Sequence, residues 1–149
     1  MSTPVLINGN FLCRNLTGIE RFAWEVLKQL DELLTSEDDF SIYIPSNKKI
    51  FPEFKKIIPV ISDKGIKIFP FWDMGAFARA VKKSRKLALN FSNTAPYGKD
   101  CVHYIDAFNT DINLDELLKE KISSPEKILE KYTYKKSAEK LLEVYRNIK

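Results

Sequence analysis

The residues best placed to bind a ligand lie in the loop that follows the first apolar run. Thr17 and Gly18 stand where this loop gives way to an amphipathic helix. Glycine lets the backbone approach a ligand closely, and the free amides at a helix start attract anionic groups. The pair could therefore hold an anion. The alternative is structural: Gly18 eases the turn and Thr17 caps the helix.

A second candidate is His103, the single histidine of the chain. It lies in an apolar stretch that we expect to form a strand over residues 102–105. Residues 103 and 105 share one face of that strand, so His103 could reach the same side as the strand end, about 6 to 7 Å deeper. The alternative is a hydrogen-bonded core histidine, which is the commoner role of a lone histidine among apolar residues.

Apolar periodicity predicts the elements that position these residues. We expect strands at residues 5–7, 40–45, 66–69, 87–91 and 102–105. We expect helices at residues 18–34, 48–58, 72–84, 114–122 and 133–148, with another opening at residues 123–126. The alternation of strands and helices along the chain predicts an α/β fold. We expect a three-layer, Rossmann-like domain with a mostly parallel sheet of about five strands and a helical carboxyl-terminal segment. Ligands of such domains bind beyond the carboxyl ends of the strands.

Length and composition predict one domain in the cytoplasm. The chain has 149 residues, of which 44% are hydrophobic, enough for one core. It has no apolar run long enough to span a bilayer, and its amino terminus has no basic segment followed by an apolar one, as a secretory signal would. We therefore expect no secretion. Cys13 and Cys101 lack metal-ligand spacing and are expected to be free thiols. We expect no metal and no cofactor.

Positive charge is concentrated in the middle of the chain. Residues 46–99 carry twelve basic and three acidic side chains, whereas residues 1–45 carry three basic and seven acidic ones. Such an excess attracts nucleic acid, anionic lipid head groups or phosphorylated sugars. Nucleic acid ranks lowest, because no recognised nucleic-acid-binding motif accompanies the charge.

Part of this charge lies on a basic amphipathic helix between Trp72 and Lys86. The apolar residues expected on one face are Met74, Phe77, Ala78 and Val81. The helix could make a peripheral contact with an anionic membrane, including the inner membrane face. The alternative, which we favour, is an ordinary helix that covers the sheet with its lysines in solvent.

The side chains of the first and last helices predict what each helix packs against. The last helix presents Ala138, Leu141, Leu142 and Tyr145 on one face, so we expect it to dock on the body. In the first helix, Trp24 falls outside the apolar stripe and is expected to form a contact surface for a partner or a second copy. The alternative is that Trp24 packs against the terminal helices.

Three motifs resemble the amino-terminal domain of retaining GT-B glycosyltransferases of family 4, a group that includes many bacterial polysaccharide enzymes. They are TGIER at residues 17–21, NFSNTAP at 90–96 and IDAF at 105–108. The resemblance implies that Thr17, Gly18, Asn93 and Thr94 line the substrate cleft and that Asp106 has a catalytic role. Ile105 occupies the family's histidine position, whereas His103 lies two residues earlier and is carried as a substrate-binding candidate.

The resemblance covers residues 5–108 and the last helix, and it omits the family's donor-binding domain. That domain uses two glutamates with seven residues between them, and no pair in this chain has that spacing. We therefore expect an acceptor-side domain at 1–108 and a helical tail at 109–149. The resemblance implies a truncated half-enzyme of polysaccharide or glycan biosynthesis that cannot turn over alone. A nucleotide sugar would be a substrate, a glycan or lipid-linked sugar the acceptor, and a donor domain the partner. The alternative is a catalytically silent module that pairs with another chain.

Overall fold

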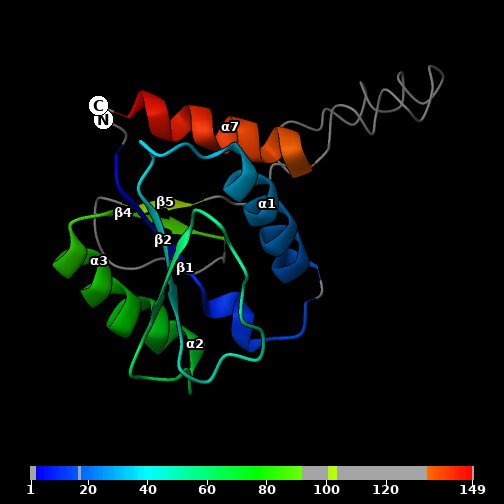
Figure 1. The fold of residues 1–149 in the computed structure, drawn as a ribbon. Coiled ribbons are helices and arrows are strands. Elements are labelled where there is room, and N and C mark those ends of the chain that lie inside the picture. The colour runs from blue at the N-terminus through cyan, green and yellow to red at the C-terminus, as the bar shows by residue number, and fades with distance from the viewer. Residues whose placement is uncertain (1–2, 17, 92–100, 104–133, 149) are drawn as a thin grey trace, which may run out of the picture.

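The computed structural model describes residues 3–16, 18–91, 101–103 and 134–148 (Figure 1). Five strands form one parallel sheet in the order β3-β2-β1-β4-β5. The strands are β1 (Val5–Asn8), β2 (Phe40–Ile44), β3 (Ile58–Ile61), β4 (Leu87–Asn90) and β5 (Cys101–His103). The predicted α/β class with a parallel sheet is confirmed.

Helices lie on both faces of the sheet (Figure 1). On one face are α1 (Ile19–Leu33) and α7 (Tyr134–Asn147). The other face carries a continuous helical segment made of α2 (Phe69–Phe71), the π-helix η2 (Trp72–Phe77) and α3 (Ala78–Ser84). A short 3-10 helix, η1 (Asn10–Cys13), follows β1. Each face therefore has its own core, and the central strand β1 is completely buried between them. This two-sided burial explains its unbroken apolar run.

The first core joins α1 and α7 to the sheet. Ala23, Val26, Leu27 and Leu30 recur at helical spacing on α1, and all are buried. The four residues expected on the inner face of the last helix, Ala138, Leu141, Leu142 and Tyr145, are buried as well. Tyr145 meets Phe40 of β2 edge-on, with 5.6 Å between ring centres. The last helix is thus part of the core.

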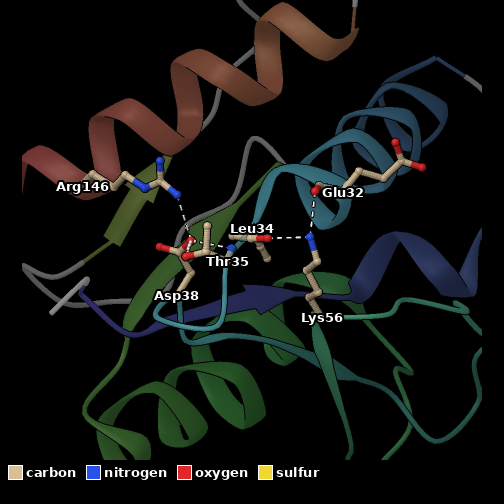
Figure 2. Close-up of polar contacts among 6 residues, drawn as sticks. All are labelled: Glu32, Leu34, Thr35, Asp38, Lys56 and Arg146. Atoms are coloured by element: carbon tan, nitrogen blue, oxygen red, sulfur yellow. Dashed lines mark hydrogen bonds and ion pairs between the residues drawn. The ribbon is translucent and has the colours of Figure 1, made fainter.

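The expected helix at residues 48–58 is wrong, because this segment has no helical turn and ends in β3. The buried carboxylate of Asp31 on α1 accepts the backbone N–H groups of Lys55, Lys56 and Ile57, each at 2.8 Å. A helix would have paired those donors with its own carbonyls. Lys56 also donates through Nζ to the carbonyls of Glu32 and Leu34 at the end of α1 (Figure 2). Hydrogen bonds between distant segments thus replace the local backbone hydrogen bonds of a helix.

The third strand was also predicted in the wrong place. Residues 66–69 do not form a strand, and Phe69 begins α2. The side chain of Asn47 occupies the position of a strand partner: Nδ2 donates to the Ile66 carbonyl at 2.8 Å, and Oδ1 accepts the Ile66 N–H at 2.7 Å. The true third strand is β3, where all four residues are exposed.

Trp24 is half-buried within its own chain. Its ring lies 6.0 Å from that of Phe54, and both pack against the first core. Phe54, in the segment before β3, therefore shields part of this ring. The helices expected at residues 114–122 and after 123 lie outside the described residues.

Candidate functional site

The strand order brings the ends of β1 and β4 together. From β1 the chain builds the sheet in one direction through β2 and β3, then returns to place β4 on the other side of β1. The gap between such strands is the topological switch point, beyond whose carboxyl ends α/β proteins bind ligands. Asn8 is the last residue of β1 and Asn90 the last of β4. Both side chains are fully buried.

Asn8 is the hub of a buried polar cluster at this point. Its Nδ2 donates to Oδ1 of Asp73 at 2.6 Å and is 3.3 Å from Oδ1 of Asn90. Its Oδ1 accepts Nε1 of Trp72 at 3.0 Å and the backbone N–H of Asn10 at 3.1 Å. Asn10 Nδ2 also donates to Asp73 Oδ1, at 3.1 Å. We call Asn8, Asn10, Trp72, Asp73 and Asn90 the switch-point cluster.

The π-helix supplies two members of this cluster from adjacent positions. Trp72 and Asp73 open η2, and both side chains are buried toward the sheet. Trp72 also stacks on Tyr43 of β2, with 5.4 Å between ring centres. π-helical turns are rare and frequently occur at functional sites. Here the wider turn accompanies an aromatic ring and a carboxylate that both face the strand ends.

Gly9 holds the loop after β1 close to β2. Its N–H donates to the Tyr43 carbonyl at 2.9 Å. A Cβ at this position would lie 2.6 Å from that same carbonyl oxygen, which a side chain cannot tolerate. The glycine therefore permits the close approach from which Asn10 reaches Asn8 and Asp73.

The cluster acts as a scaffold. Its polar side chains are buried and bonded to one another, and such networks fix the position of the backbone that carries them. The loop after β1 leaves the sheet at Asn8, so the cluster sets where this loop begins.

The loop after β1 is electropositive. Burial raises the pKa of the Cys13 thiol above its ordinary value of 9.0, while the positive charges of Lys48, Lys49 and Arg14 act to lower it. Arg14 also pairs with Glu20 at 3.3 Å. The Cys13 thiol lies 3.6 Å from Oδ1 of Asn47 and can donate to it. These cations favour an anionic group beside the loop.

The structure describes only two of the residues expected at the site. Gly18 is the N-cap of α1 with a φ of 53°, in the region that favours glycine. The expected cap by Thr17 falls outside the described residues. His103 ends β5 and is paired in register with Asn90. The remaining candidates, Thr17, Asn93, Thr94 and Asp106, lie outside the described residues.

The members of the switch-point cluster were not predicted as site residues. The sequence motifs include neither Asn8 nor Asn10, and Asn90 is only the first residue of the motif at 90–96. One signal was present: Asn8 and Asn90 each end an apolar strand, and Asp73 is the one acid between residues 64 and 86.

Comparisons with protein-family models, with curated proteins and with solved structures find no match to this chain. Within the described residues, no group of three or more histidine, cysteine or acidic side chains could hold a metal ion. Among the same residues, no helix is both long and apolar enough to cross a membrane.

Proposed function

We propose that this chain is the acceptor-side half of a GT-B glycosyltransferase. Its domain would be a three-layer, Rossmann-like unit that receives a glycan or a lipid-linked sugar at the carboxyl edge of the sheet. The switch-point cluster carries this proposal, because it joins the ends of β1 and β4 where α/β folds bind ligands. The three motif resemblances support sugar transfer as the class of reaction.

In this proposal the cluster positions the residues that touch the acceptor. The segment after Asn8 leads to Thr17 and Gly18, and the segment after Asn90 leads to Asn93 and Thr94. The hydroxyl and amide groups of these side chains suit the hydroxyls of a sugar. The basic side chains around the first loop favour an acceptor that carries phosphate. Asp106, which follows β5 in the sequence, would act at the reacting hydroxyl, with His103 nearby.

The half-enzyme would need a donor domain from another chain. Because no two glutamates have seven residues between them, we propose that a partner holds the nucleotide sugar and that this chain does not turn over alone. No cofactor is required for such a transfer, since the nucleotide sugar is itself a substrate. We propose a cytoplasmic location, where nucleotide sugars are made and where free thiols such as Cys13 persist.

Calorimetry on the full chain tests the proposal. Uridine-diphosphate glucose and guanosine-diphosphate mannose should give no heat of binding at micromolar concentrations and no released nucleotide. A panel of polysaccharide repeat-unit oligosaccharides should include a ligand whose affinity falls in Asn93→Ala and Thr94→Ala but not in the control Asn147→Ala. Micromolar binding or hydrolysis of either nucleotide sugar would refute the missing donor site.

One observation favours the second candidate, a silent module that pairs with another chain. β3 is an edge strand whose apolar residues Ile58, Val60 and Ile61 are all exposed. The Ser62 N–H points toward β2, where it donates to the Ile44 carbonyl. Backbone N–H groups point to alternate sides along a strand, so the N–H that Pro59 lacks would have pointed to the outer edge of β3. A partner would therefore pack on the faces of β3 and not extend the sheet.

Sedimentation distinguishes the two candidates. For the interaction module, the chain should associate with itself or with a donor-domain chain, Ile61→Lys should weaken that association, and no oligosaccharide should bind. For the half-enzyme, oligosaccharide binding should persist in Ile61→Lys, because β3 is separated from β4 by two strands.

A further inference from the structure

A row of apolar side chains at the start of the α2–η2–α3 segment faces solvent. Ile68, Phe71 and Met74 are 55%, 68% and 41% exposed. Ile68 belongs to the first turn, since its carbonyl accepts the N–H groups of Phe71 and Trp72 at 3.2 and 3.3 Å. All three side chains therefore lie on the solvent side of the helical segment, away from the sheet. We call them the outer apolar row.

This row is distinct from the face that covers the sheet. Trp72 and Phe77 are buried in the second core, where Val81 also packs. The apolar face expected from sequence is thereby divided: Phe77 and Val81 point inward, whereas Met74 is exposed. The segment fulfils its structural role with one face and still carries large apolar side chains on the other.

Basic side chains continue this outer surface toward the end of α3. Between residues 64 and 86 the exposed basic residues are Lys64, Lys67, Arg79, Lys82, Lys83 and Arg85. The one acid in this stretch is Asp73, which is buried in the switch-point cluster. Lys86 is already paired, through Nζ, with Asp39 at 2.6 Å. Exposed cations thus dominate the segment, and Asp63 lies just before it.

We propose that this surface binds an anionic lipid membrane peripherally, with the outer apolar row inserted among the acyl chains and the basic residues at the phosphates. A helix lying flat on a bilayer presents both kinds of side chain at once, which is the arrangement of interfacial amphipathic helices. Lipid is favoured over nucleic acid because Ile68 and Met74 gain from entering hydrocarbon but contribute little beside a phosphate backbone. The inference does not depend on the glycosyltransferase proposal.

Vesicle co-sedimentation of the full chain tests the inference. The probes are phosphatidylcholine vesicles alone and vesicles with 30 mol% phosphatidylglycerol (a fraction of about one third), at low and high salt. The chain should sediment with the anionic vesicles only, and less at high salt, where exposed charges are screened. Replacing Lys82 and Lys83 by Glu should lower the partition coefficient at least about 10-fold. Phe71→Ser should lower it roughly 10-fold.

Two variants on α7 are the matched controls. Val144→Ser changes another exposed apolar side chain, and Lys135→Glu reverses another exposed charge. Both should bind vesicles like the unaltered chain, and circular dichroism should show that all variants are folded. The inference fails if neither vesicle binds the chain, or if the α7 variants lose binding to the same extent. It also fails if the surface variants change only binding to a single-stranded oligonucleotide, followed by fluorescence anisotropy.

Discussion

Arg146 and Asp38 are 108 residues apart in the chain and form an ion pair at 2.9 Å (Figure 2). Oδ2 of Asp38 also accepts the backbone N–H and the hydroxyl of Thr35, each at 2.9 Å. One carboxylate therefore ties the turn between α1 and β2 to α7. Near the other terminus, the Thr3 hydroxyl donates to the Ile148 carbonyl at 3.1 Å. Thr3 and Ile148 are thus joined to each other, and α7 is joined to the turn before β2.

This ion pair predicts an acid-sensitive contribution to stability. Burial acts to raise the pKa of Asp38, but the hydrogen bonds from Arg146 and Thr35 outweigh it and hold the pKa below its ordinary value of 3.8. The contribution is therefore complete above about pH 4 and is lost as the pH falls through the lowered folded pKa. Urea unfolding should show Arg146→Gln destabilised by about 0.5 to 1 kcal/mol at pH 7.

The difference should shrink below pH 4, and the control Lys135→Gln should match the unaltered chain at every pH. A destabilisation of Arg146→Gln that stays constant from pH 7 to pH 2 would show that the carboxylate is not responsible.

Removing a buried leucine from α7 should destabilise the whole chain. Leu141→Ala leaves a cavity between α7 and α1 and should cost about 2 to 5 kcal/mol in urea unfolding. Val144→Ala, on the exposed side of the same helix, should cost less than about 1 kcal/mol. Similar effects for the two substitutions, or an unchanged melting temperature after deletion of residues 133–149, would mean that α7 does not support the core.

Asn8 should matter for stability more than any exposed asparagine. Asn8→Leu keeps the branched shape of the side chain but removes the acceptor of the Trp72 Nε1–H and the Asn10 N–H groups, together with one donor to Asp73. Orphaned buried polar groups cost about 1 to 3 kcal/mol each, so we expect a loss of roughly 3 kcal/mol. Asn147→Leu, at the exposed end of α7, should stay within about 0.5 kcal/mol. A tolerated Asn8→Leu would indicate that the cluster does not hold the strand ends.

The Cys13 thiol should react slowly at neutral pH. Because burial raises its pKa above 9.0, little thiolate forms below that value. In a Cys101→Ser background, the iodoacetamide rate should keep rising beyond pH 9. Lys48→Ala removes a charge that lowers this pKa, so it should shift the profile to higher pH, whereas Lys135→Ala should not. A rate that reaches its plateau below pH 8 would contradict this environment.

Local patterns predicted the elements that carry a clear helical spacing or an unbroken apolar run. The helical spacing at Ala23, Val26 and Leu30 is sufficient to define α1, and the apolar runs ending at Asn8 and Asn90 define β1 and β4. The segment before β3 could not be predicted in this way, because it is organised by the side chain of Asp31 on α1, more than twenty residues earlier. Side-chain bonds across such separations leave no periodic signal.

The strand, the glycine-containing loop and the helix that follows them led us to expect a site beyond the end of β1, but they do not point to the residues of the switch-point cluster. The sequence shows that Asn8, Asp73 and Asn90 are neighbours only once the strand order is known. Asp73 lies on η2, which covers one face of the sheet, and Asn90 follows Asn8 by 82 residues. Their burial also hides them from a search for exposed catalytic groups.

The most direct test of the proposed function is an NMR titration of the full chain that follows the side-chain amide signals of Asn8, Asn10 and Asn90. The titrants are the oligosaccharide panel and, separately, uridine-diphosphate glucose. We predict that an oligosaccharide shifts these three signals and the Gly9 backbone amide, while the nucleotide sugar leaves them unchanged at about millimolar concentration. Oligosaccharides that leave all four signals in place, or a nucleotide sugar that binds at micromolar affinity, would contradict an acceptor-side site at the ends of β1 and β4.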